Sequence, residues 1–413
     1  MNSPAVIDLP SEVSEDVILL EPELVTETPP SQTLLGRAFG WVSWSIGGAF
    51  CLASLIACLT ALARVPILQL IAFGYLLDVS GRLSGGAKVR DCLPKLREAG
   101  QIGLVVLTVF VAALPIQLFA HLQSVSVLIS PEASGGSILR WVSIALAALG
   151  VWYVVWAVAR GGRLRHFLWP QPIRALREAW RPSTYAELPD RLWEFTKSLE
   201  LRRYFWLGLR GLIGTLIWLI PAMVIIAANR NGETGAAGLL GATAFVALGI
   251  VMMYLPMLQA HFAAEDRFRA IFEVRRIRRL FCYAPWAWFL AMTLGLVLLP
   301  IPLYLLKIEA TPEEVTWLPI LVCITFLLPA RIVEGLALRR ARRIADESYS
   351  GGEVKPSGMP MFLSRMTARY LIAGIVVVYL AFVTASQYTS WDGLTTWVQQ
   401  HAVLIPIPFL SGV

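Results

Sequence analysis

Long apolar stretches recur along the chain, separated by shorter polar connections. Eight windows of about 20 apolar residues fit the sequence, at 41–63, 101–122, 138–159, 205–228, 237–258, 284–306, 316–337 and 370–389. A helix of that length rises about 30 Å, the thickness of the hydrocarbon core of a bilayer. The windows are too long for strands and lack the two-residue alternation of a membrane β-barrel. The pattern therefore predicts an all-α polytopic membrane protein with about eight transmembrane helices.

Composition and charge support this class. Hydrophobic residues make up 57% of the 413 residues and charged residues only 15%, whereas about 25% of an ordinary soluble domain is charged. Of the 35 Lys and Arg, 29 lie in alternate connections, at 64–100, 160–204, 261–283 and 338–369. Because positive residues are retained on the inner side of a membrane, these four connections are predicted to be cytoplasmic.

Apolar residues alternate with arginines in these connections. In 265–281 the apolar residues recur at three- and four-residue steps, which predicts an amphipathic helix lying in the plane of the membrane surface. We expect anionic lipid headgroups, and not nucleic acid, to be the partners of the basic residues. The lipid-facing candidates are Arg275, Arg276, Arg278, Arg279, Arg339, Arg340, Arg342 and Arg343. A role as topology signals alone would explain the arginines but not the apolar residues between them.

The two ends of the chain are predicted to lie outside the helical bundle. Residues 1–35 are rich in acidic residues and proline and have almost no periodicity, which is typical of a disordered tail. The tail has no signal-peptide pattern, so 41–63 should remain as a span. Because the connection after this span is basic, the tail is predicted to lie outside. An alternative keeps the tail inside and makes 65–79 a short return segment. Residues 391–413, with Trp397, are predicted to rest in the outer interface.

A possible internal repeat divides the membrane part into two halves. The sequence PILQ at 66–69 matches PMLQ at 256–259, and Pro115 and Pro300 close the windows that follow. Two four-helix halves, 36–230 and 235–390, would then be parallel repeats, although a chance match of short apolar motifs also explains the likeness. Prolines inside spans predict kinks. The predicted kinks are at Pro66, Pro115, Pro256, Pro300 and Pro329.

The sequence contains no catalytic motif, cofactor motif or metal-ligand spacing, and we predict none of these sites. The five cysteines are scattered and are best read as packing residues.

Ionisable residues near the spans are few, and each has a neighbour on its own helical face or a route to the surface. Arg331 with Glu334, and Asp78 with Arg82, have the spacing of pairs within one helix. His261 and Glu265 could pass a proton or bind a metal if a third ligand came from another helix. Arg210 can extend toward the cytoplasmic surface.

One stretch resembles a known family. The run GYLLDVSGRLSGGAKVRDCLPKLREAGQIG, preceded by VPILQ, is similar to an uncharacterised family of bacterial multi-pass membrane proteins classed as a domain of unknown function. The matching positions are Pro66, Gly74, Tyr75, Leu76, Leu77, Gly81, Arg82, Leu93 and Pro94. The resemblance implies a location in the bacterial inner membrane and carries no activity.

Two hypotheses for the function follow. In the first, a non-enzymatic membrane protein contacts anionic lipid or a partner protein through its basic connections. In the second, a carrier or flippase-like protein moves a hydrophobic or lipid-like substrate through a cavity between the two halves. An enzyme has the weakest support, because only His261 and Glu265 favour it. The oligomeric state cannot be read from the sequence.

Overall fold

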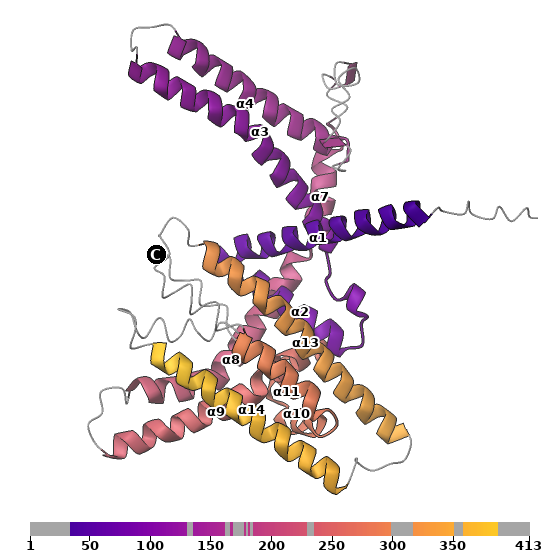
Figure 1. Ribbon diagram of the computed structural model, residues 1–413, viewed down its shortest axis with the longest axis vertical. Helices are drawn as coiled ribbons and strands as arrows, with labels where there is room; N and C mark the ends of the chain where they lie inside the picture. Colours follow the sequence, from indigo (N-terminus) through magenta and orange to yellow (C-terminus); the bar gives the residue numbers. More distant parts are fainter. Residues whose placement is uncertain are drawn as a thin grey trace, which may run out of the picture. The chain divides into compact units, whose positions relative to one another are not determined.

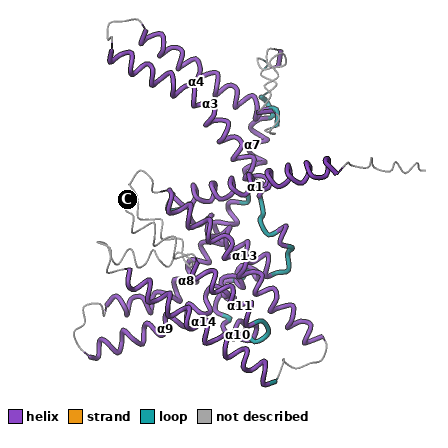
Figure 2. The backbone as a smooth tube through the Cα atoms, in the orientation of Figure 1, coloured by secondary structure: helices purple, strands orange, loops and turns teal. Residues whose placement is uncertain are grey.

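We describe the protein from a computed structural model. It describes residues 34–129, 135–161, 166–167, 177–178, 181, 185–228, 235–298, 317–350 and 358–386. The predicted tail at 391–413 and residues 1–33 of the N-terminal tail lie outside these ranges. The described residues are mostly helical and include no strand (Figure 2), so the all-α prediction is confirmed. The chain divides into two compact units, Met1–Gly47 and Gly48–Val413.

Figure 1 shows the helices in chain order. They are α1 (Leu34–Arg64), α2 (Gln69–Ser84), η1 (Val89–Asp91), α3 (Leu96–Ile129), α4 (Gly135–Ala159), α7 (Leu188–Ser198), α8 (Leu201–Ala228), α9 (Gly235–Glu265), η3 (Phe268–Phe272), α10 (Val274–Phe281), α11 (Pro285–Thr293), the π-helical turn η4 (Leu294–Leu298), α13 (Trp317–Ser350) and α14 (Met359–Ser386).

Among the described residues, seven helices are long and apolar enough to cross a membrane. They correspond to all the predicted windows except the sixth. That window begins as α11, and its residues 299–306 lie outside the described part of the chain. Val274–Phe281 and Pro285–Val297 would together form an eighth span, but the two parts are bent by 108°. The chain is therefore a multi-pass integral membrane protein.

The helix α2 is the most deeply buried element. All its residues from Ile71 to Gly81 are buried, and it packs against α8, α9 and α13. At the α8 crossing a Cβ on Gly74 would lie 1.9 Å from the carbonyl oxygen of Tyr204, so only glycine permits this approach of the two backbones. This helix belongs to the basic connection at 64–100. It is buried because its apolar side chains lie on all sides of the helix.

The helices α3 and α4 pack side by side as an antiparallel pair (Figure 1). Their other faces carry exposed apolar side chains, including Phe110 at 59% and Trp141 at 71% exposure. Such faces are expected of helices surrounded by lipid, because hydrocarbon does not penalise an exposed apolar side chain. The start of α3 meets α1 closely, with Gly100 against Cys51 and Gly103 against Ser54.

The prolines of the predicted kinks have different surroundings. Pro115, Pro256 and Pro329 lie inside α3, α9 and α13. Pro66 lies in the turn between α1 and α2, where the chain breaks, and Pro300 lies outside the described residues. The motif PILQ at 66–69 begins in the turn after α1, whereas PMLQ at 256–259 lies inside α9. The two matching motifs therefore differ in structure. The two-halves layout stays a prediction, and α2 contacts helices from both predicted halves.

Candidate membrane-surface site

The helix α10 separates its apolar and basic side chains onto two faces. Ile277, Leu280 and Phe281 are buried against the helical bundle. The four arginines of α10 are exposed. Three of these, at positions 275, 278 and 279, make no ion pair within the described part of the chain. The fourth, Arg276, lies 3.4 Å from both Glu265 and Glu273. This face thus offers three uncompensated positive charges.

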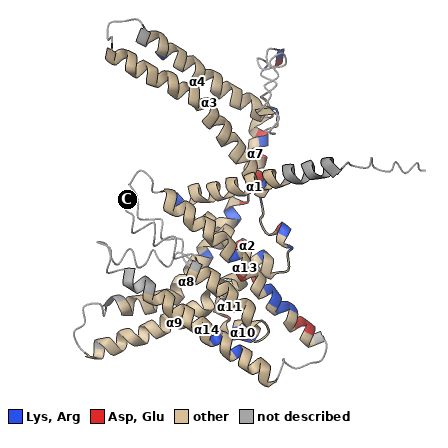
Figure 3. Cartoon of the chain, in the orientation of Figure 1, with Lys and Arg blue, Asp and Glu red and all other residues tan. Residues whose placement is uncertain are grey.

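The four candidate arginines of α13 do not share one environment. Arg339 donates a hydrogen bond of 2.8 Å to the carbonyl oxygen of Ala87, just after α2. Arg342 donates one of 3.2 Å to the carbonyl oxygen of Ser84. Arg340 is exposed, and Arg343 pairs with Glu347 at 2.7 Å. Because carbonyls at the end of a helix carry partial negative charge, two of the four arginines close the end of α2. Figure 3 shows the basic residues along the last turns of α13.

His261 joins α9, α10 and α13 through both of its ring nitrogens. Arg342 Nη2 lies 2.6 Å from Nδ1, and an arginine can only donate, so Nδ1 is the acceptor. Nε2 then carries the proton and donates to Glu273 at 3.1 Å. The histidine side chain is fully buried. The geometry therefore assigns a neutral imidazole with one defined tautomer.

Glu265, the predicted partner of His261, lies farther away than Glu273. Its Oε1 is 4.0 Å from Nδ1 and interacts with Arg342 at 3.6 Å. Among the described residues, no group of three His, Cys, Asp or Glu side chains is arranged to hold a metal ion. With both ring nitrogens engaged, His261 organises an ion-pair cluster. The hydrogen bond from His261 lowers the pKa of the Glu273 carboxyl, and Arg276 lowers it further.

A second polar cluster fixes the buried helix α2. Asp78, only 2% exposed, accepts from Arg82 at 2.5 Å, which confirms the predicted pair, and from Arg203 of α8 at 2.8 Å. Tyr75 donates to the carbonyl oxygen of Pro94 at 2.9 Å and so holds the chain that follows α2. Three residues that carry the family resemblance, Tyr75, Arg82 and Pro94, thus take part in the contacts that hold α2 in place.

The segments before α3 and α8 are joined by an ion pair between two strained residues. Lys95 and Glu200 both have positive φ, at 60° and 51°, which costs energy for residues other than glycine. The Nζ of Lys95 lies 2.9 Å from Oε1 of Glu200. The same kind of link occurs after α9, where Asp266 has a φ of 48° and pairs with Arg210 at 2.6 Å. Left-handed residues at these helix ends therefore place ion pairs that connect neighbouring helices.

The pairing of Arg331 with Glu334 is confirmed. Their side chains are 3.0 Å apart and only 0% and 1% exposed. The Arg331 guanidinium also lies 6.0 Å from the centre of the Phe73 ring of α2. Glu334 Oε1 lies beside Gly295 in the π-helical turn η4. This buried ion pair lies where α13, α2 and η4 meet.

Two arginines of α14 hold the bend between α10 and α11, and sequence reasoning did not single them out. Arg365 donates a hydrogen bond of 3.0 Å to the carbonyl oxygen of Cys282. The Arg369 guanidinium lies 5.5 Å from the centre of the Phe281 ring. Trp286 of α11 donates to the Ser364 hydroxyl at 2.9 Å. The only signal in the sequence was their place in the last basic connection, 338–369.

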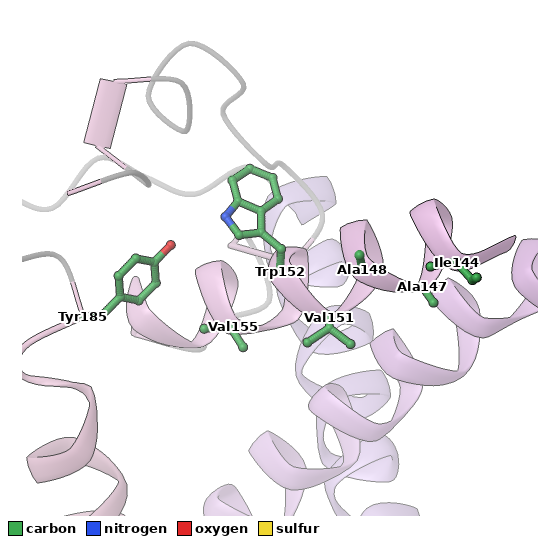
Figure 4. A pocket seen from close by; sticks show the side chains of 7 residues that line it. All are labelled: Ile144, Ala147, Ala148, Val151, Trp152, Val155 and Tyr185. Carbon is green, nitrogen blue, oxygen red and sulfur yellow. The ribbon is translucent and has the colours of Figure 1, made fainter. Parts of the chain in front are cut away.

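A shallow apolar groove follows the outer face of α4 (Figure 4). Tyr185, which precedes α7, lies at one end of it. The residues of α4 that line it are Ile144, Ala147, Ala148, Val151, Trp152 and Val155. Its lining residues include none of the prolines at the predicted kinks.

Comparison with known proteins finds one match. Residues 184–308 match the profile of a family described as "Protein of unknown function (DUF4013)", which confirms the expected likeness to a domain of unknown function. The match covers α7 to η4, whereas the resemblance noted in the sequence rests on residues 66–94. No curated protein and no solved structure matches the chain.

Proposed function

We propose that this integral membrane protein is a non-enzymatic protein of the bacterial inner membrane whose basic helix α10 binds the anionic surface of the cytoplasmic leaflet. The observation that carries the proposal is the division of α10 into a buried apolar face and an exposed face, where three arginines make no ion pair with any residue that the structure describes. Because the bundle holds the apolar face, the helix presents its exposed cations outward, where they can lie among the headgroups.

The position of α10 in the chain supports this role. The 108° bend after it turns the chain from α10 into the apolar α11. Trp286 follows the bend and is 49% exposed, and tryptophan is favoured at the level of the headgroups. A bend between a basic helix and an apolar helix is expected where a chain passes from the surface into the hydrocarbon.

The expected attraction is moderate and depends on salt. A cation near an anionic leaflet contributes about 1 kcal/mol, so the three unpaired arginines together contribute about 3 kcal/mol. Counter-ions screen such charges over about 8 Å at physiological ionic strength. High salt should therefore weaken the contact of α10 with the membrane while the buried apolar face stays packed.

The proposal can be tested with the full-length protein in nanodiscs. With phosphatidylglycerol present, hydrogen exchange at α10 should be slower than in phosphatidylcholine alone. Replacing Arg275, Arg278 and Arg279 with Gln should remove that difference. The control R343Q, at an arginine already paired with Glu347, should keep it. Equal exchange in the two lipids for the unaltered protein would refute the proposal, and would favour a protein partner for this face.

The carrier hypothesis keeps one supporting observation, the buried Arg331–Glu334 pair. Ionisable residues inside a membrane are costly and often mark transport paths. Movement of a labelled lipid between the leaflets of proteoliposomes distinguishes the two functions. A surface-binding protein should leave that rate unchanged, whereas a flippase should raise it and lose the effect in E334Q.

A further inference from the structure

The helices α10, α11 and α14 carry arginines but no acidic residue. The segments Val274–Leu298 and Met359–Ser386 contain neither Asp nor Glu. Their basic residues are Arg275, Arg276, Arg278, Arg279, Arg365 and Arg369. We call Arg278, Arg365 and Arg369 the bend patch. Carboxylates elsewhere in the described chain pair with Arg276 but not with Arg278 or Arg279.

Two elements bring the bend patch together. Arg365 and Arg369 of α14 contact Cys282 and Phe281 at the end of α10. Arg278 lies one helical turn before these contacts, at the edge of the buried face of α10. Arg365 and Arg369 are half-buried, and their contacts restrict their side chains. Part of the conformational entropy that these two side chains would lose on binding a ligand is therefore already lost in the free protein.

An exposed apolar surface lies next to the bend patch. Trp286 and Leu290, one turn apart on α11, are 49% and 53% exposed. The hydrogen bond from Trp286 to Ser364 places this surface beside α14. Tyr370, adjacent to Arg369 in the chain, is 69% exposed. A positive patch that borders an apolar membrane surface fits a ligand with both an anionic head and hydrocarbon chains.

We propose that the bend patch binds the phosphate of an anionic phospholipid of the inner leaflet, with the acyl chains lying against Trp286 and Leu290. This rests on the proposed function and narrows it from a charged surface to one lipid site. Guanidinium groups suit the phosphate because their planar N–H groups donate two parallel hydrogen bonds. The apolar neighbours favour a lipid over free phosphate, which would gain nothing from them.

The test measures phosphatidylglycerol bound to the full-length protein by native mass spectrometry, titrated from nanodiscs of phosphatidylcholine. The variant R278Q/R369Q should weaken the tightest site about tenfold or more, since loss of about 1.4 kcal/mol is a factor of ten. The control R269Q/R340Q removes the same charge from exposed arginines of η3 and α13 and should leave that site unchanged. If R278Q/R369Q loses helicity, the single variant R278Q, which changes an exposed side chain, is measured in its place.

The outcomes separate the site from the proposed function. An equal loss in both double variants would overturn the lipid site and leave general binding to the leaflet intact. No preference for phosphatidylglycerol in the unaltered protein would reject both proposals. Release of the lipid by inorganic phosphate or glycerol phosphate as readily as by phosphatidylglycerol would also overturn the site, because it would show that the chains contribute nothing.

Discussion

At the scale of the residue, the neutral His261 is the best-defined polar group. It accepts from Arg342 and donates to Glu273, so it joins helices that lie far apart in the sequence. A second proton would have to enter at Nδ1, opposite an arginine donor. Two donors facing each other at hydrogen-bond distance repel, so the cluster requires the neutral form.

Acid should weaken this cluster through Glu273. Its pKa is lowered from the ordinary value of 4.5, so the folded state favours the charged carboxylate. The stabilisation is present above the ordinary pKa and is lost as the pH falls through the lowered, folded-state value. We expect the unaltered protein to lose more thermal stability than E273Q below about pH 4.5. Circular dichroism melts in detergent from pH 3 to 7 measure this, and parallel curves for the two proteins would contradict it.

At the scale of the element, the fold depends on how the end of α2 is closed. Arg339 and Arg342 of α13 donate to carbonyls at and just after the end of α2. Tyr75 holds the same connection at Pro94. Cys92 lies within it at 1% exposure, and burial raises the pKa of its thiol. The rate at which Cys92 reacts therefore reports on opening of this connection.

Replacing Arg339 should open the connection locally. A hydrogen bond to a charged group is worth about 1.5–3 kcal/mol, so R339Q should raise the rate of maleimide labelling at Cys92 about tenfold or more. The measurement uses a variant in which the cysteines at 51, 58, 282 and 323 are replaced by Ser. R340Q, one residue along but exposed, is the matched control. Equal rates in R339Q and R340Q would show that Arg339 does not hold the connection.

At the scale of the whole molecule, the direction of α2 bears on the topology. The Ser84 hydroxyl at its end donates to the carbonyl oxygen of Ala260 at 3.3 Å. It therefore lies near the end of α9 that is predicted to be cytoplasmic. A helix of 16 residues rises about 24 Å, which is shorter than the bilayer core. Since α2 runs toward the side that is predicted to be cytoplasmic directly after α1, its direction favours the alternative in which 65–79 is a return segment.

Labelling from outside the cell tests this topology. In a cysteine-free background, cysteines placed at Ser11 and Ser357 should resist a membrane-impermeant maleimide, whereas one at Ser134 should react. The basic connections and the chain before α1 would then share the cytoplasmic side. Labelling of Ser11 with Ser134 would restore a full span for α1. Equal labelling of Ser357 and Ser134 would contradict the whole layout.

The sequence by itself determined the features that depend on neighbours along one helix. Apolar windows of bilayer length established the all-α membrane class, and helical spacing predicted the pairs Asp78–Arg82 and Arg331–Glu334. The same periodicity predicted an apolar and a basic face for 274–281, and the structure packs the apolar face against the bundle. These features follow from the helix period and from solvent preference, which both act over a few residues.

Only the tertiary structure decided which groups of other helices each polar side chain contacts. The sequence pattern around an arginine does not distinguish one that faces a headgroup, as proposed for Arg278, from one that donates to a backbone carbonyl, as Arg339 does. Arg203 meets Asp78 from 125 residues away, and Arg342 meets His261 from 81. The spacing of residues carries no information about such contacts, because they depend on how helices pack. The packing likewise placed α2 inside the bundle.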